Sequence, residues 1–314
     1  MLQQFPSHTI ATHQTNQHRL MNSNHDEAQS NYNDFNEILQ SEVYVDLERL
    51  RMLARHGVPN ELRGEVWKYL LGVQQADRSK ELSMSKARKD DYLQMDKTDP
   101  DVAKRIRGEV SRLQRRVPML DGRHYLARFE NVIIAYLNTN RDAEYHPAMV
   151  SLCAPFIYVL NEEWDAYYCF EQVMQALDEH YTMNTVKESV AKFMTLFRYV
   201  LPELCNYFEE EEVNIHEWIT SWLQYMLSRE MRFEDLIRLW DAYFAMPDFL
   251  EFHPFVCLAI LFNFRESLED LEQSEIRTML LCLPNMRIER VLVEAYNLRH
   301  ESMERQLSED GGYL

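Results

Sequence analysis

Glycine is scarce in this sequence: 7 of 314 residues are glycine, and no glycine cluster separates short runs of alternating hydrophobicity. This composition argues against an all-β sandwich or barrel. No run of 18 or more apolar residues occurs, so no segment is predicted to span a membrane. Leu, Met, Glu, Arg and Gln are plentiful and favour helices, and 46% hydrophobic residues suffice for a sizeable core. We therefore predict an all-α fold.

Sequence signatures of nucleotide, nucleophile and metal sites are absent as well. The chain contains no GxxxxGK or GxGxxG loop and no GxSxG motif. It has neither a CxxC nor a His-x3-His pattern, so we predict no metal site and no cofactor in this chain. The cysteines are odd in number, widely spaced and set among apolar neighbours, which is typical of buried thiols in a reducing compartment: Cys153, Cys169, Cys205, Cys257 and Cys282.

Negative charge dominates, with a formal net charge of −18 at pH 7. A surface this acidic repels phosphate backbones and anionic lipid headgroups, so nucleic acid is not an expected partner. The first 25 residues contain one Lys or Arg, Arg19, which is too few for a mitochondrial presequence. We expect a cytoplasmic protein, with peripheral association with endomembranes through a partner as the alternative.

Composition divides the chain into three segments. Residues 1–41 are rich in Gln, Asn, His and Ser and are predicted to be a disordered tail. A passive tail and a partner-binding arm are both compatible with this composition. Residues 42–300 are predicted to form a single helical domain, and residues 301–314 a polar C-terminal tail.

Apolar residues recur at helical spacing through residues 42–300. Asn60 is a candidate N-cap, Gly72 a helix end and Asp99-Pro100 a helix start. The acidic run Glu209–Glu212 is expected in a loop, because negative charge opposes the dipole at a helix C-terminus. Further helices are predicted over residues 124–138, 148–160, 164–181, 185–208, 215–228, 233–245, 253–268, 274–282 and 287–298.

Three separated motifs carry a family resemblance. The first runs from His56 to Gly72 and reads HGVPNELRGEVWKYLLG. The second, YHPAM, covers residues 145–149, and the third runs from Arg229 to Asp241 and ends in RLWD. Together they resemble the TBC family, the helical domains that accelerate GTP hydrolysis by Rab-type small GTPases. The resemblance spans about residues 52–298 and implies one TBC-like multi-helix domain.

Four residues of the first and third motifs have a structural interpretation. Trp67 and Trp240 offer large apolar areas that belong in a helical core. Arg63 and Asp241 are charges within apolar runs, and such groups need partners when they are buried. We expect these four residues to hold the fold.

TBC domains supply an arginine from an Ile-x-x-Asp-x-x-Arg motif, and the resemblance assigns this role to Arg112 in the run Ile106–Arg112. Glu109 stands where the family has Asp, and Arg115 and Arg116 follow closely. An arginine supplied in trans contributes a factor of about 10³–10⁵ to the rate of GTP hydrolysis. Arg112 is therefore a candidate arginine finger. The alternative is that it is one of several surface arginines in a basic docking patch.

The family also supplies a glutamine, from Tyr-x-Gln-Gly-Met, and its position here is Pro147. Proline has neither a side-chain amide nor a backbone N–H, so it cannot orient water. Ala148 replaces the glycine that follows. The remaining candidate binding residues lie on either side of these two positions: Tyr145, His146 and Met149 in this motif, and Glu109, Arg115 and Arg116 in the arginine motif.

The resemblance thus implies a TBC-domain regulator of a Rab-type small GTPase, formally a GTPase-activating protein with weak or altered catalysis because the glutamine finger is missing. The alternative is a catalytically silent GTPase-binding or scaffold module within a trafficking or signalling complex. GTP and Mg²⁺ would be bound by the partner GTPase. This chain would stimulate the partner's hydrolysis rather than act on a nucleotide of its own.

Overall fold

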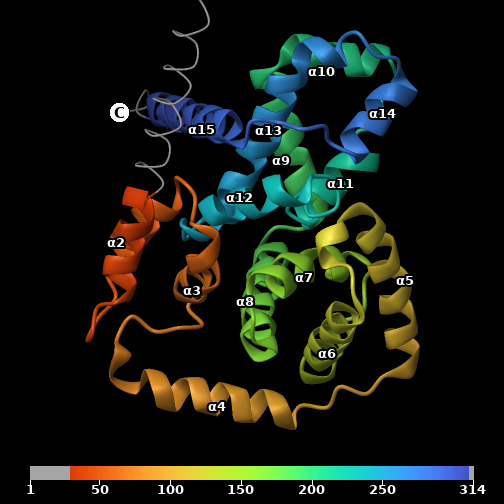
Figure 1. Ribbon diagram of the computed structural model, residues 1–314. Coiled ribbons are helices and arrows are strands. Elements are labelled where there is room, and N and C mark those ends of the chain that lie inside the picture. Colours follow the sequence, from red (N-terminus) through yellow and green to blue (C-terminus); the bar gives the residue numbers. More distant parts are fainter. Residues whose placement is uncertain (1–28, 311–314) are drawn as a thin grey trace, which may run out of the picture.

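The computed structural model describes residues 29–310, with side chains as far as residue 304. Across this range the regular structure is helical, apart from an isolated antiparallel bridge between Tyr44 and Asp77. The predicted all-α fold is confirmed. Figure 1 shows the earlier helices in the lower half of the molecule and most of the later ones in the upper half, with α12 (Phe233–Phe244) between them.

The lower half begins with a helix at residues 29–39. It continues with α2 (Leu47–Ala54), α3 (Asn60–Leu70), η1 (Arg78–Lys80), α4 (Glu81–Gln94), α5 (Pro100–Arg116), η2 (Pro118–Leu120), α6 (Arg123–Thr139), α7 (Ala148–Val159) and α8 (Glu163–Met183). Helix α6 packs against α5, α7 and α8, and α3 packs against α7. Helix α7 also contacts α5 and α8, so it lies at the centre of this half.

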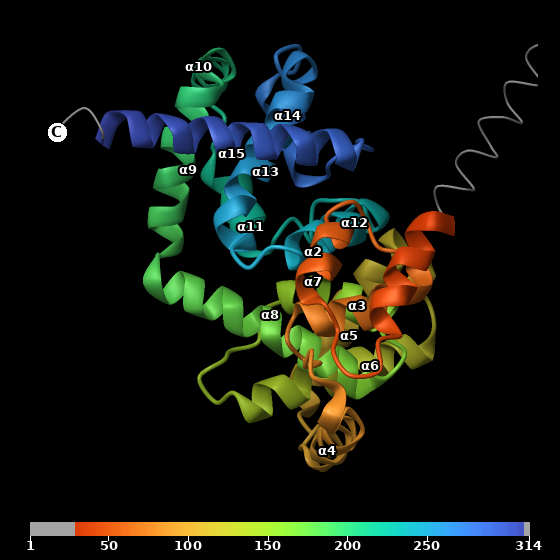
Figure 2. The same ribbon diagram turned by 90° about the vertical axis from the view of Figure 1, so that its left-hand side faces the viewer.

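The upper half contains α9 (Val186–Val200), α10 (Pro202–Glu210), α11 (His216–Gln224), α13 (Phe249–Leu268), α14 (Gln273–Leu281) and α15 (Ile288–Asp310). Helix α13 packs along α15, and α9 contacts both α10 and α11. Helix α12 contacts α3 on one side and α15 on the other, so it joins the two halves. Figure 2 shows this arrangement from the side.

Several helix ends follow from local chemistry. Asp99 accepts hydrogen bonds from two first-turn N–H groups of α5, and Pro100 opens the helix, as predicted. Gly72 follows the end of α3 with a φ of +75°, which glycine adopts without steric cost. The predicted N-cap at Asn60 is wrong: Asn60 is the first residue of α3, and its side-chain oxygen accepts from Arg63 instead.

A large apolar core extends through both halves. It includes the four fully buried tryptophans Trp67, Trp218, Trp222 and Trp240. A second, smaller cluster lies between the helix at residues 29–39, α2 and α3. Its members are Phe35, Ile38, Val45, Leu50, Ala54, Val58, Val66, Tyr69 and Ala245.

Part of the predicted N-terminal tail is folded. The helix at residues 29–39 buries Phe35 and Ile38 in the second cluster, and Arg49 of α2 binds its Glu37 through two hydrogen bonds of 3.1 and 3.2 Å. Two apolar residues three apart form one helical face, which is sufficient to dock a short helix on a larger one. Residues 1–28 of the predicted tail lie outside the described residues.

Other boundaries differ from expectation. Glu209 and Glu210, expected in a loop, are the last residues of α10, and the helix expected over residues 215–228 ends at Gln224. The helix predicted at residues 185–208 is two helices, because Pro202 begins α10. Helix α13 begins at Phe249 and contains Pro254. The polar tail predicted at residues 301–314 is helical as far as Asp310, because its Glu, Met, Arg and Gln residues favour helix and extension of α15 adds a hydrogen bond per residue.

Two predictions from composition can be compared with the described residues. Within residues 29–310, no helix is long and apolar enough to cross a bilayer. Cys153, Cys169, Cys205 and Cys257 are buried free thiols, as predicted, whereas Cys282 is exposed just after α14.

Candidate functional site

Arg112 projects from the solvent side of α5, because Ile106 and Val110 turn the other face of the helix into the core. Its guanidinium binds Glu109, one turn earlier, through Nε–Oε2 at 3.2 Å and through a second bond from Nη2 to Oε1. This carboxylate raises the pKa of the Arg112 guanidinium. The arginine side chain remains 61% exposed. The pair therefore holds a positive group at the surface in a defined pose.

A cleft of about 350 Å³ opens beside this pair. Helices α5 and α7 and the segment after α11 form its walls, with Glu109, Arg112, Arg116, Val150, Ser151 and Arg229 among the lining residues. Three arginines against one carboxylate make the cleft positive in a chain whose net charge is −18. A positive concavity raises the local concentration of anionic groups.

Pro147 is the N-cap of α7 and makes no side-chain capping bond. The first N–H groups of the helix are already occupied. Ala148 donates to Nδ1 of His146 at 3.2 Å, Met149 donates to the His146 carbonyl at 2.9 Å, and Val150 donates to the Pro147 carbonyl at 3.3 Å. The start of α7 therefore presents neither a side-chain amide nor an unoccupied backbone donor at these positions.

His146 is held against Tyr225. The two rings stack with centroids 5.1 Å apart, and Nε2 lies 3.1 Å from the tyrosine Oη. Because Nδ1 accepts from the Ala148 N–H, the hydrogen of the neutral ring is on Nε2 and is donated to Tyr225. Burial lowers the pKa of His146, and the nearby Arg229 and Arg105 lower it further. His146 is therefore a neutral ring beside Pro147.

The other two candidate binding residues of this motif are less accessible. Tyr145 is half-buried beneath Arg105, whose guanidinium carbon lies 4.5 Å from the ring centroid. Its Oη is buried and has no hydrogen-bond partner in residues 29–304, and burial raises the pKa of this phenol. Met149 is 6% exposed and belongs to the large core. Met149 therefore packs within the domain and is not available for direct contact with a partner.

The basic residues that follow Arg112 have different environments. Arg116 lines the cleft, and its Nη1 donates to the backbone carbonyl of Arg229 at 2.5 Å. Arg115 folds back onto its own helix, where Nε donates to the Ser111 carbonyl at 3.2 Å. Arg112 and Arg116 therefore face the same cleft, while Arg115 lies outside its lining.

Arg229 is a cleft residue that sequence reasoning did not assign to the site. It follows Met226 and Leu227, whose φ values of +50° and +61° are in the left-handed region. Such conformations cost non-glycine residues about 1–3 kcal/mol each and concentrate at functional sites. No spacing rule connects position 229 with position 112, so the sequence offered only an arginine at the start of the third motif.

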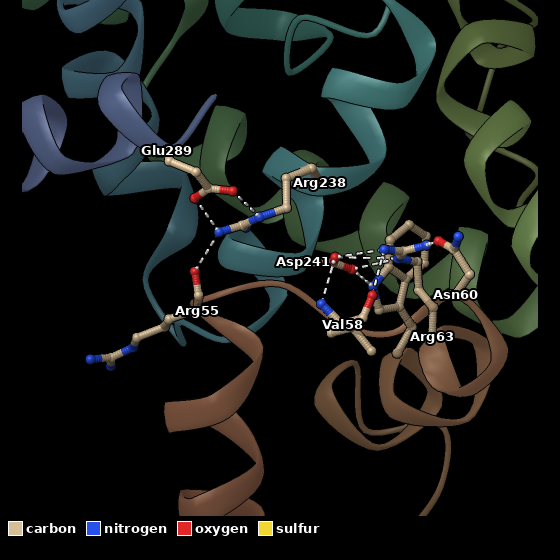
Figure 3. A network of polar contacts seen from close by, with 8 residues as sticks. Arg55, Val58, Asn60, Arg63, Arg238, Asp241 and Glu289 are labelled. Atoms are coloured by element: carbon tan, nitrogen blue, oxygen red, sulfur yellow. Dashed lines mark hydrogen bonds and ion pairs between the residues drawn. The ribbon is translucent and has the colours of Figure 1, made fainter. Parts of the chain in front are cut away.

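The four residues expected to hold the fold lie together, and Figure 3 shows the polar contacts of two of them, Arg63 and Asp241. Asp241 is completely buried. It accepts from Nε of Arg63 at 3.0 Å, from the Val58 N–H at 3.0 Å and from Nε1 of Trp67 at 2.8 Å. Burial raises the pKa of Asp241, and these donors oppose the shift. Trp240 packs on Trp67 with ring centroids 6.5 Å apart, so the network fastens α12 to α3.

Arg238 extends this network to α15. Its Nε and Nη2 bind Glu289 at 2.9 and 2.7 Å, and Nη2 also donates to the Arg55 carbonyl at 3.0 Å (Figure 3). The adjacent cavity, about 660 Å³, is larger than the arginine cleft. Its two arginines, Arg63 and Arg238, already have carboxylate partners, so the charges there have a structural explanation. In the described part of the chain, no group of three His, Cys, Asp or Glu side chains is placed to hold a metal ion.

Known proteins share both the sequence pattern and the fold. GTPase-activating protein gyp1 of Schizosaccharomyces pombe is 24% identical over 306 residues, covering 83% of this chain and 59% of that protein. Human TBC1 domain family member 22B is 22% identical over 309 residues, covering 85% of this chain and 61% of that protein. The chain thus spans about three fifths of the length of these curated relatives.

Two solved structures show the same architecture. The crystal structure of the Ypt/Rab-GAP domain of Gyp1p superposes with a TM-score of 0.76 at 18% identity, covering 88% of this chain and 99% of that one. The Chlamydomonas flagellar RabGAP TBC domain gives a TM-score of 0.65 at 19% identity, covering 94% and 97%. At these identities the likeness shows the fold. The profile of the Rab-GTPase-TBC domain matches residues 60–269, which is more than half of the sequence, and the chain therefore belongs to the Rab-GTPase-TBC domain family.

Proposed function

We propose that this chain binds a Rab-type small GTPase at the arginine cleft and accelerates its GTP hydrolysis weakly, through Arg112. The proposal rests on a difference between the two catalytic positions: the arginine of the family is present, whereas the glutamine is not. Arg112 is exposed at a positive cleft and held by Glu109. Pro147 has no side-chain amide, and the first N–H groups of α7 are bonded within the chain.

An arginine alone supports part of the reaction. Its guanidinium neutralises charge that develops on the transferring phosphoryl group, a contribution of about 10³–10⁵ when the arginine is well placed. Positioning the attacking water needs a side-chain acceptor that proline lacks, so this task would be performed by the partner GTPase's own residues. GTP and Mg²⁺ would belong to the partner. The chain would act in the cytoplasm, with any association with endomembranes made through that partner.

The proposal is tested by single-turnover GTP hydrolysis with a panel of Rab-type GTPases and a stoichiometric excess of this protein. We expect a modest acceleration that Arg112→Ala abolishes, and a larger one with Pro147→Gln. State-selective binding is measured in parallel, with GTP-loaded and GDP-loaded GTPase.

Two results would change the interpretation. Binding that prefers the GTP-loaded state, without acceleration, would indicate a catalytically silent GTPase-binding module. Equal or absent binding to both states across the panel would reject GTPase regulation and favour a helical scaffold with another partner.

A further inference from the structure

The guanidinium of Arg229 forms no polar contact that would stabilise the fold. It lines the cleft that contains Arg112, and the residue is exposed. Within residues 29–304 this guanidinium makes neither a hydrogen bond nor an ion pair. The centroid of the Tyr225 ring lies 5.9 Å from the guanidinium carbon, and the arginine's charge acts on the nearby His146 and Glu230 side chains. By contrast, Arg112 is bonded to Glu109, and Arg116 to a backbone carbonyl.

The backbone around Arg229 is held firmly although its side chain is free. The Arg229 carbonyl accepts from Arg116 at 2.5 Å. The next residue, Glu230, is 5% exposed and accepts from Ser221 Oγ at 2.5 Å, while its carbonyl accepts from the Leu283 N–H at 2.9 Å. Together with the left-handed φ values of the two residues at positions 226 and 227, these contacts fix the backbone position from which the Arg229 side chain extends. An exposed group on a strained, anchored segment is typical of a functional position.

Arg229 also lies near the position where the glutamine is missing. Tyr225 links the two places, because it stacks on His146 and lies near the Arg229 guanidinium. The positive charge of Arg229 contributes to the lowered pKa of His146, the residue that precedes Pro147. Arg112 and Arg229 thus approach one cleft from different parts of the chain, one from α5 and the other from the segment between α11 and α12.

We propose that Arg229 is a second cationic catalytic residue, which contacts the γ-phosphoryl oxygens of the GTP held by the partner and stands in for part of the missing glutamine. This inference rests on the proposed function. In the reaction, water attacks the γ-phosphorus, the bond to the β,γ-bridging oxygen breaks, its electron pair leaves with GDP, and the water proton passes to the released phosphate. Arg229 stabilises the charge on the phosphoryl oxygens. As a donor without an acceptor atom, it does not orient the water, so we expect the activity to be weak.

The experiment compares the native chain with Arg229→Ala, Arg229→Lys and Arg112→Ala in single-turnover hydrolysis and in binding to GTPase loaded with GDP and aluminium fluoride, a mimic of the transferring phosphoryl group. Arg232→Ala is the matched control, because Arg232 is an exposed arginine three residues along that lines a different cavity. Thermal unfolding of each variant shows whether the fold is retained.

We expect Arg229→Ala to lower both the hydrolysis rate and the affinity for the aluminium fluoride complex at least tenfold, with ground-state binding to GTP-loaded GTPase changed less than threefold. Arg229→Lys should restore part of the loss, and Arg232→Ala should match the native chain. If Arg229→Ala stays within twofold of native while Arg112→Ala falls, or if aluminium fluoride adds no affinity to the native chain, the assignment of Arg229 is wrong. Failure of the proposed function is seen separately, as native protein that does not distinguish GTP-loaded from GDP-loaded GTPase.

Discussion

Arg63 and Asp241 lie 178 residues apart in the sequence and form a buried ion pair, with Nε of the arginine 3.0 Å from Oδ1 of the aspartate. Asp241 has no solvent exposure, and its carboxylate also accepts hydrogen bonds from the Val58 N–H and the Trp67 indole. The pair connects α3 in one half of the molecule to α12, which also contacts α15 in the other half. It therefore stabilises the relative position of the segments that surround the arginine cleft.

Asp241→Asn should destabilise the domain by about 3–5 kcal/mol, because it leaves the Arg63 guanidinium buried without a counter-charge. Denaturant unfolding followed by circular dichroism measures the change in the free energy of unfolding. As a control, Arg198→Ala removes an exposed ion pair with Glu209 and should leave the unfolding midpoint unchanged. Equal midpoints for Asp241→Asn and the native chain would contradict a stabilising role for the buried pair.

Gly57→Ala should destabilise the fold more than Gly72→Ala. Both glycines have left-handed φ values, +103° and +75°, which cost an alanine about 1–2 kcal/mol. At position 57 the added Cβ would also lie 2.9 Å from Nε of Arg238, whereas at position 72 nothing lies within 4 Å. The steric conflict should add about 1–3 kcal/mol.

A double-mutant cycle separates the two contributions at Gly57. In an Arg238→Ala background the steric part of the cost of Gly57→Ala should disappear. Its effect on the free energy of unfolding should then be similar to that of Gly72→Ala. If the cost of Gly57→Ala is the same with and without Arg238, the close approach between the two residues is not its cause.

Phe35→Ala should destabilise the domain by about 3–5 kcal/mol, the usual cost of removing a buried phenylalanine side chain. Phe35 has no solvent exposure and packs in the cluster shared with α2 and α3. The measurement is equilibrium unfolding, with hydrogen exchange of residues 29–39 as a local reading. Leu82→Ala is the control, because Leu82 is 86% exposed on α4. Native stability and native protection in Phe35→Ala would mean that this helix is not part of the cooperative fold.

The stability of the domain should fall as the pH is lowered from about 6.5 to about 4, because of His253. This ring is 2% exposed, and its nitrogens lie 2.6 Å from Tyr243 Oη and 2.7 Å from the Trp222 carbonyl. Burial lowers the pKa of His253 to about 4, from an ordinary 6.5. Between these values the unfolded chain takes up a proton that the folded chain does not.

Linkage then predicts that His253 removes about 3 kcal/mol of stability by pH 4, with full stability above pH 6.5. Chemical unfolding across this pH range measures it. Replacing the exposed His300 by glutamine should leave the profile unchanged, whereas His253→Gln should flatten it. A profile that does not depend on residue 253 would contradict the assignment.

Much of the architecture could be predicted from the sequence because a helix depends mainly on residues that are close together in the chain. The 3.6-residue recurrence of apolar residues located most helices, and Asp99-Pro100 and Gly72 marked ends through short-range backbone chemistry. The break at Pro202 was also present in the sequence, as a residue that lacks the N–H a continuing helix needs. The helix at residues 29–39 was missed because two apolar residues, Phe35 and Ile38, are too few to show a helical face in the sequence. Their burial depends on α2 and α3, against which they pack.

The candidate site divides in the same way. The residues themselves determined that Pro147 offers no amide, that Arg112 follows Glu109 by one helical turn, and that Arg63 and Asp241 need partners if buried. The tertiary structure decided that Met149 is in the core, that Arg115 lies outside the lining of the cleft, and that Arg229 shares a cleft with Arg112. A sequence encodes covalent chemistry and the preferences of neighbouring residues, whereas proximity between positions 112 and 229 exists only after the core has folded and placed α5 beside the segment that follows α11.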